Sequence, residues 1–176
     1  MADNENLKPA LEFAKEKHKG QKRIGGEDYI YHPIAVCEIV KSQGFDENYQ
    51  KVALFHDLLE DTDTTEEDIL RYGNQEILEA VKLLTKEKGY NMSEYISNIK
   101  SNPIAFEVKA ADRLHNLQCA IVANEEFKRK YILETVDWYM DFSHEIRKAV
   151  KTLAESLENP IVELSFLYEP IETWKK

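Results

Sequence analysis

The sequence predicts an all-α domain of roughly seven or eight helices. Apolar residues recur at helical spacing along most of the chain, which is the primary signal of amphipathic helices. Glycine, proline and asparagine stand between these stretches, where helices end. With 176 residues, 43% of them hydrophobic and 32% charged, the chain can bury one sizeable core. We expect one domain over residues 1–160 and a C-terminal tail over 161–176, which could form a strand or an extended arm.

Helices are expected wherever the apolar spacing continues between turn residues. In chain order they span residues 7–20, 33–44, 46–62, 65–73, 77–84, 93–102, 104–121 and 125–157. A capping box at Thr65–Asp68 starts the fourth helix, and Ser93 is expected to cap the sixth. Because Pro33 opens the second helix, His32 is expected just outside it, and residues 29–31 are expected to be extended.

The charge balance restricts the classes of partner. A net charge of −10 and a pI near 5.1 argue against binding to nucleic acid, which depends on clustered positive charge. No apolar run approaches the ~20 residues that span a bilayer. The acidic segment 1–6 lacks the features of a signal peptide. We expect a cytoplasmic protein with a small-molecule ligand and no membrane partner, and a homo-oligomer stays open.

Residues 52–62 place four ligand-type side chains at the end of an apolar run. Residues four apart stack on one side of a helix, so we expect His56 beneath Glu60 and Asp57 beneath Asp61, in tiers ~5.4 Å apart. The lower tier suits a divalent transition metal, and the upper carboxylate pair can take a proton from water. The alternative is a solvated helix end with a core histidine. Burying this much charge is costly unless it is paired or binds a metal, which favours a site.

A second polar cluster lies within residues 108–117. Asp112 follows small apolar residues, and Asn116 shares its helix face four residues later. Alone, this cluster could be an ordinary polar helix face. Asp112 would add a fourth ligand to His32 and the His56-Asp57 pair. Nitrogen and oxygen ligands suit Mn²⁺, Fe²⁺, Co²⁺ or Zn²⁺, and the lack of thiolates disfavours a closed structural zinc site.

Four ordered segments resemble a known family. The order His32, His56-Asp57, Asp112 resembles the H…HD…D metal signature of the HD-domain phosphohydrolase superfamily. Within it, the sequence is most similar to the hydrolase domain of RelA/SpoT-type alarmone enzymes and their stand-alone small relatives. The family patterns GQ-x-R, YI-x-HP, HD-x-x-ED-T and K-x-ADR-x-HN match residues 20–23, 29–33, 56–62 and 109–116. The resemblance covers roughly residues 7–150.

The resemblance implies an HD-domain helical bundle that removes the 3′-pyrophosphate of (p)ppGpp with one Mn²⁺. The implied metal ligands are His32, His56, Asp57 and Asp112. The implied catalytic pair is Glu60 and Asp61. The candidate substrate-binding residues are Arg23 beside the guanine base, Asn116 near the ribose, Tyr131 in the nucleotide pocket, and the cations Lys22 and Lys109.

Three positions depart from the family pattern. Ile24 stands where many relatives have lysine, Asp28 where they have proline, and Gln118 where arginine is common. Two alternatives therefore stay open: an HD phosphohydrolase acting on a nucleoside monophosphate or on the 2′-phosphate of NADPH, and a non-catalytic nucleotide-binding module. The intact Glu60-Asp61 pair argues against the binding module, since a pure binder needs no base.

Overall fold

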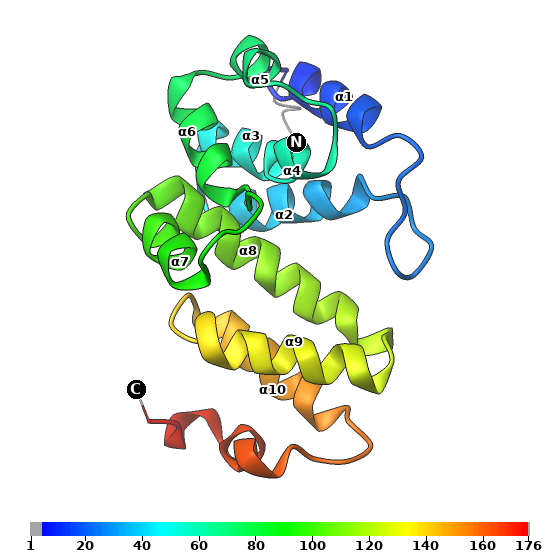
Figure 1. The fold of residues 1–176 in the computed structure, drawn as a ribbon, viewed down its shortest axis with the longest axis vertical. Coiled ribbons are helices and arrows are strands. Elements are labelled where there is room, and N and C mark those ends of the chain that lie inside the picture. The colour runs from blue at the N-terminus through cyan, green and yellow to red at the C-terminus, as the bar shows by residue number, and fades with distance from the viewer. Residues whose placement is uncertain (1–4, 176) are drawn as a thin grey trace. The chain divides into compact units, whose positions relative to one another are not determined.

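A computed structural model describes residues 5–175 as helices joined by short connections (Figure 1). Ten α-helices and no β-strand occur within these residues, which confirms the all-α class. The helix count exceeds the expected seven or eight because two of the expected helices are each broken in two. Most of the acidic segment 1–6 used against a signal peptide lies outside the described residues. Within residues 5–175, every helix is too short or too polar to cross a lipid bilayer.

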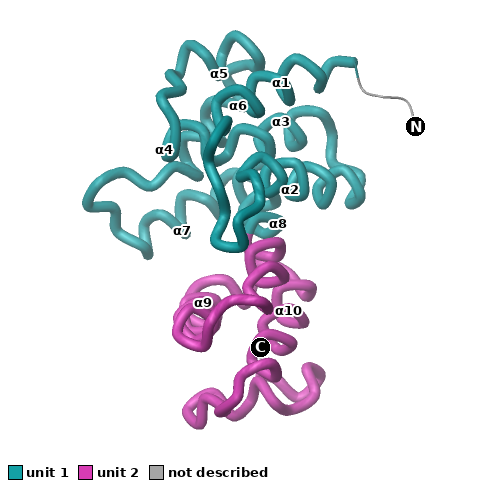
Figure 2. The backbone as a smooth tube through the Cα atoms, turned by 90° about the vertical axis from the view of Figure 1, so that its right-hand side faces the viewer, with its two compact units in different colours: residues 1–112 teal, residues 113–176 magenta. Residues whose placement is uncertain are grey.

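The chain forms two compact units, residues 1–112 and 113–176 (Figure 2). The first unit contains α1 (Lys8–Lys17), α2 (Tyr31–Ser42), α3 (Glu47–Phe55), α4 (Leu58–Asp61), α5 (Glu66–Tyr72), α6 (Gln75–Leu84), α7 (Met92–Lys100) and part of α8 (Pro103–Cys119). The second contains the rest of α8, α9 (Glu125–Trp138) and α10 (His144–Glu155). The domain limits expected at residue 160 stay a prediction.

Helix α3 anchors the core of the first unit. It packs against α1, α2 and α6, and its residues Val52, Ala53 and Phe55 are fully buried. Phe13 of α1 meets the Phe55 ring edge-on, with centroids 5.9 Å apart. Burying each such large apolar side chain stabilises the fold by about 1.5–3 kcal/mol. The polar residues that follow Phe55 are therefore fixed to a rigid, apolar support.

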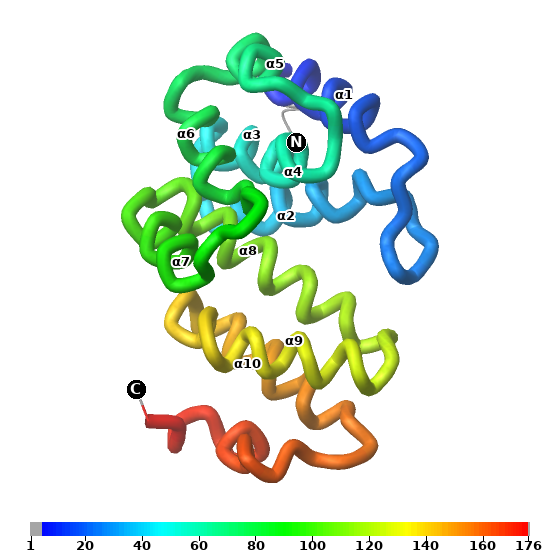
Figure 3. Tube along the Cα trace, in the orientation of Figure 1, coloured from blue at the N-terminus to red at the C-terminus, as the bar shows by residue number. Residues whose placement is uncertain are grey.

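Helix α2 begins two residues before Pro33, so the expectation that His32 lies outside the helix is wrong. Residues 29–31 are not extended either: Ile30 has helical dihedrals, and the N–H of His32 donates to the Tyr29 carbonyl at 2.9 Å. The first-turn N–H groups of a helix have no partner within it, so Pro33 in that turn sacrifices no helical hydrogen bond. The loop between α1 and α2 is the blue loop in Figure 3.

The helix expected over 46–62 is broken at His56 and Asp57, between α3 and α4. His56 Nδ1 lies 2.6 Å from the Ala53 carbonyl oxygen. A continuous helix would offer that carbonyl to the N–H of Asp57, so the imidazole competes for the acceptor.

Other helix ends, and the C-terminal tail, can be compared with the expectations in the same way. The helix expected over 125–157 ends at Trp138, and Ser143 starts α10 by accepting from the N–H of Ile146 at 3.1 Å. Asn91, not Ser93, caps α7, and the capping box at Thr65–Asp68 is confirmed. The tail forms 3₁₀ turns at Val162–Tyr168 and Ile171–Thr173 instead of a strand, since its N–H groups bond within the segment.

Candidate metal centre

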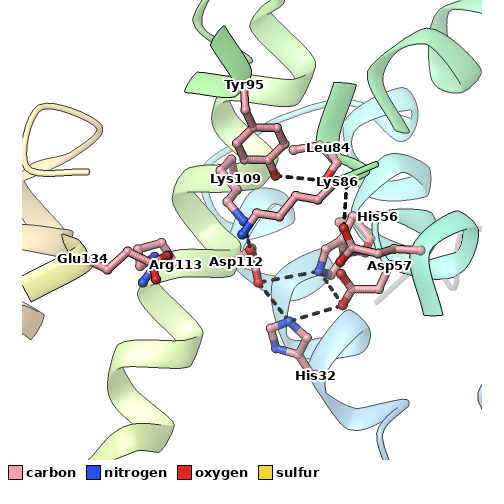
Figure 4. A network of polar contacts seen from close by, with 12 residues as sticks. His32, His56, Asp57, Leu84, Lys86, Tyr95, Lys109, Asp112, Arg113 and Glu134 are labelled. Carbon is pink, nitrogen blue, oxygen red and sulfur yellow. Dashed lines mark hydrogen bonds and ion pairs between the residues drawn. The ribbon is translucent and has the colours of Figure 1, made fainter. Parts of the chain in front are cut away.

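Three elements of the first unit bring together the four side chains expected to hold a metal. His32 comes from α2, His56 and Asp57 from the α3–α4 junction, and Asp112 from α8 (Figure 4). His32 Nε2 lies 3.0 Å from Asp112 Oδ1 and 3.9 Å from Asp57 Oδ2. His56 Nε2 lies 3.0 Å from Asp57 Oδ2 and 3.6 Å from Asp112 Oδ1. Two imidazole nitrogens therefore face two carboxylate oxygens.

The cluster is buried, and its two carboxylates favour a positive charge on His56, whereas burial lowers the pKa of His32. His32, His56 and Asp112 are 1%, 4% and 6% exposed. Burial disfavours a charged His56, but the carboxylates of Asp57 and Asp112 outweigh it and raise the pKa of the imidazole. Burial also opposes ionisation of Asp112, yet Lys109 and both imidazoles lower the pKa of its carboxyl well below the usual range. Both effects arise because buried carboxylates require a neighbouring cation.

The donor set fits a divalent metal. The Ala53 carbonyl can only accept, so Nδ1 of His56 carries the proton and Nε2 faces the carboxylates. That Nε2 is buried and has no well-aligned hydrogen bond among the described residues. Ligand atoms of His32, His56 and Asp57 lie within 4.8 Å of one another. Histidine held by a backbone carbonyl through its other nitrogen is the usual support of a metal ligand.

The carboxylate pair lies on the one-turn helix α4, next to this cluster. The N–H of Asp61 donates to the Asp57 carbonyl at 2.9 Å, so the expected stacking of Asp57 and Asp61 survives the helix break. Carboxylate oxygens of Asp57, Glu60 and Asp61 lie within 4.8 Å of one another. Burial, then Asp57 and Glu60, raise the pKa of Asp61 to about 6. Glu60 Oε1 accepts from the backbone N–H of Lys86 at 2.6 Å.

Arg23 and Lys109 are held beside the cluster by aromatic and acidic neighbours. Tyr29 donates its hydroxyl to Asp57 Oδ2 at 2.6 Å, and Arg23 Cζ lies 5.9 Å from the Tyr29 ring centroid. Lys109 Nζ lies 2.8 Å from Asp112 Oδ2. Tyr29 was not expected from the sequence to contact a ligand, although it belongs to the YI-x-HP segment that could have drawn attention to it.

Lys86 and Lys109 share one aromatic neighbour, whereas Lys22 lies elsewhere in an exposed ion pair. Lys86 Nζ and Lys109 Nζ lie 5.4 and 5.9 Å from the Tyr95 ring centroid, so two ammonium groups share one aromatic side chain. Lys22 instead forms an exposed ion pair with Asp28. Of the expected cations, Lys109 therefore has the more direct link to the cluster.

Asn116 and Tyr131 belong to the second unit. Asn116 is half-buried on α8. The Tyr131 ring stacks on Phe127 with centroids 5.3 Å apart, and Arg113 Cζ lies 4.4 Å from it. Arg113 is buried and also contacts the Tyr139 ring and the Glu134 carboxylate. The places of Asn116 and Tyr131 in a nucleotide pocket stay a prediction.

Known proteins similar to this chain carry related names. The chain is 33% identical to a guanosine-3′,5′-bis(diphosphate) 3′-pyrophosphohydrolase of Aquifex aeolicus, over 98% of this chain and 25% of that protein. It is 31% identical to a protein of the same name from Haemophilus influenzae, over 88% and 24%. It is 32% identical to GTP pyrophosphokinase rsh of Brucella melitensis, over 96% and 23%. The chain thus spans about a quarter of the length of these relatives.

The fold is also similar to a solved structure described as "A metazoan ortholog of SpoT hydrolyzes ppGpp and plays a role in starvation responses". The TM-score is 0.66 at 22% identity, over 96% of each chain, so the likeness shows the fold. A family model described as "HD domain" matches residues 10–146, which is most of the sequence. The chain belongs to the HD-domain family.

Proposed function

We propose that this chain is a metal-dependent phosphohydrolase that removes the 3′-pyrophosphate of (p)ppGpp, releasing GDP or GTP and pyrophosphate. The observation that carries the proposal is the convergence of two buried imidazoles and two carboxylates beside a carboxylate of raised pKa. The names of relatives that match nearly the whole chain support the substrate. Because that substrate is an intracellular nucleotide, we also infer a cytoplasmic enzyme.

The metal would be held by His32, His56, Asp57 and Asp112. This mixture of nitrogen and oxygen ligands supports Mn²⁺, with Fe²⁺, Co²⁺ and Zn²⁺ as alternatives. With a metal bound there, the site has a Lewis acid for the phosphoryl oxygen and a water whose pKa is lowered toward neutrality.

Asp61 is the stronger candidate for the general base. Its pKa of about 6 lies near the working pH, where a base is most effective, and Glu60 is engaged by the Lys86 N–H. Asp61 takes a proton from the attacking water, whose oxygen bonds to the phosphorus on the 3′ oxygen. The bond from that phosphorus to the 3′ oxygen breaks, and the 3′ oxygen takes a proton from solvent and leaves as a hydroxyl, while Asp61 returns its proton to solvent. Lys109, Lys86 and Arg23 offset the charge of the phosphates.

Turnover of a nucleotide panel with Mn²⁺, with products separated by anion exchange, tests the substrate. The expected result is conversion of ppGpp to GDP and pyrophosphate. If ppGpp is untouched while another phosphorylated nucleotide turns over, the alarmone assignment is wrong and a hydrolase of another nucleotide replaces it. Ile24 favours that second candidate, because this 78% exposed apolar side chain stands where many alarmone hydrolases have a lysine.

The ligand and base assignments have their own test. Metal analysis after reconstitution should find one divalent ion in the wild type and less in Asp112→Ala. Glu60→Gln and Asp61→Asn should keep the metal, and the variant of the true base should lose about 10²–10⁴-fold in kcat. Metal-free wild type, or normal kcat in both carboxylate variants, would contradict these assignments. Metal binding without turnover of any nucleotide would instead favour the binding module.

A further inference from the structure

Residues 21–29, here called the clip, form a tight loop closed by backbone hydrogen bonds. The N–H of Tyr29 donates to the Gln21 carbonyl and the N–H of Arg23 to the Glu27 carbonyl, both at 2.9 Å. Gly26 takes a φ of +87° at the turn, where a side chain would be strained. Gln21 and Tyr29 therefore stand opposite each other at the base of the clip.

The two base residues of the clip contact opposite ends of α4. Tyr29 donates its hydroxyl to Asp57 Oδ2 at 2.6 Å, directly before α4 begins. Gln21 donates its Nε2 to the carbonyl of Asp61 at 2.8 Å, where α4 ends. The clip thus reaches the metal-ligand tier with one side chain and the carboxylate pair with the other.

A buried histidine orients the Gln21 amide. His18 Nδ1 lies 2.7 Å from Gln21 Oε1, and His18 is 2% exposed. Because the Asp61 carbonyl can only accept, the amide must present its NH₂ group to Asp61 and its oxygen to His18. The His18 ring also lies 4.8 Å from the Tyr29 ring. The three side chains form one contiguous support.

Helix α4 needs such support because it is a single turn. Four residues are far fewer than the roughly 12–15 at which isolated helices become even marginally stable. The Asp57 side chain does not cap the helix and is engaged by Tyr29 and the imidazoles instead. Contacts from outside α4 must therefore define where Glu60 and Asp61 lie relative to Asp57.

We propose that Tyr29 and Gln21 are positioning residues that hold α4 at both ends and so set the separation between Asp57 and the Glu60-Asp61 pair. This inference rests on the proposed function, in which Asp57 holds the metal and Asp61 takes the proton. Tyr29 acts on metal affinity, because it orients a ligand. Gln21 acts on the catalytic step, because it orients the base.

The Tyr29 role is tested with Tyr29→Phe, which removes the hydroxyl and keeps the ring beside Arg23 and His18. The Kd for Mn²⁺, measured by titration calorimetry, should rise roughly 10- to 100-fold, as for other outer partners of metal ligands. The matched control is Tyr31→Phe, since Tyr31 is 59% exposed and lies two residues away. A Kd for Tyr29→Phe equal to that of the control would overturn this half of the proposal.

The Gln21 role is tested with Gln21→Met, which keeps the side-chain length and loses the amide. The Kd for Mn²⁺ and the KM should stay at wild-type values, while kcat falls roughly 10- to 100-fold because the base is displaced. Gln43→Met is the control at an exposed glutamine. If Gln21→Met does not fold, Gln21→Glu retains the acceptor for His18, sets a carboxylate against the Asp61 carbonyl, and should show the same loss. Normal kcat, or a loss confined to KM, would overturn the role.

Hydrogen exchange separates failure of this proposal from failure of the proposed function. The amides of Asp61 and Thr62, which bond to Asp57 and Leu58, should exchange faster in both folded variants than in the controls. This readout and the Mn²⁺ Kd need no substrate, and kcat is read on whichever nucleotide the wild type hydrolyses. Unchanged exchange in both variants would overturn the proposal even if ppGpp proves to be the substrate.

Discussion

The surroundings of Asp61 disfavour the negative charge of its carboxylate. Burial and the neighbouring carboxylates of Asp57 and Glu60 raise its pKa to about 6, well above its value in an unfolded chain. Between the unfolded and folded pKa values the folded state binds more protons, so stability falls as pH rises. Above pH 6 the penalty is fully present, and it disappears as pH falls through the unfolded value of about 3.9. The carboxylate is kept for a reason other than stability.

Asp61→Asn should therefore stabilise the metal-free protein at pH 7.5 by about 1 kcal/mol, a figure reduced for solvent screening at this partly exposed side chain. The gain should shrink as pH is lowered from 6 toward 4. Urea unfolding in the presence of a chelator, at several pH values, measures the difference in free energy of unfolding. A variant that is less stable than wild type at pH 7.5 would contradict the account.

Arg23 and Ile24 are neighbours with opposite consequences for substrate binding. Arg23 lies against the Tyr29 ring, whereas Ile24 is an exposed apolar side chain. Arg23→Ala should raise KM for ppGpp, because a guanidinium can stack on or hydrogen-bond a purine. Ile24→Lys should lower KM with kcat nearly unchanged, the pattern of binding that is equal in ground and transition states. Steady-state kinetics at saturating Mn²⁺ check both, and a change in kcat alone would contradict this division.

Helices α9 and α10 are separate because Ser143 caps the start of α10. Ser143 has an extended backbone, and its hydroxyl accepts from the Ile146 N–H. Ser143→Ala should lower the free energy of unfolding by about 1 kcal/mol, because a first-turn donor loses its partner. Ser97→Ala, at an exposed position inside α7, serves as the control. Equal denaturation midpoints for the two variants would show that the cap does not stabilise α10.

The helices were predictable from the sequence where their ends carry local signals. The Thr65–Asp68 capping box marked α5 correctly, because all its hydrogen bonds are made within four residues. Ser143 carried a similar signal, but the apolar spacing runs on across it and favoured one long helix. The break at His56 could not be read locally, since it depends on an imidazole turning onto the Ala53 carbonyl.

In the candidate metal centre, the ligand side chains were predictable from the sequence, but the residues that orient them were not. The four side chains expected as ligands do converge, because imidazoles and carboxylates in buried helices need one another. Tyr29 and Gln21 were not expected, since their contacts with Asp57 and Asp61 depend on the backbone pairing of the clip. Sequence spacing indicates ligands on helices but not the loop that orients them.

The expected metal ligands all belong to one compact unit of the chain. His32, His56, Asp57 and Asp112 lie within residues 1–112. A ligand that binds only the folded state stabilises it by about 2.7 kcal/mol at a hundredfold excess over Kd. Saturating Mn²⁺ should therefore raise Tm and increase hydrogen-exchange protection chiefly within residues 1–112. The metal should leave the Tm of Asp112→Ala nearly unchanged, and an equal rise in that variant would place the bound metal elsewhere.

Because the Ala53 carbonyl holds one proton on Nδ1 of His56, a metal must displace the second proton from Nε2, and the buffer takes that proton up. Nδ1 keeps its proton in every state, so the extra proton favoured by the raised pKa of His56 must reside on Nε2. A cation can bind there only after that proton has left. The heat of Mn²⁺ binding should thus differ between PIPES and Tris at one pH, because the buffer takes up the proton that the site releases. Acidification should empty the centre, so that its occupancy follows the pH of its surroundings.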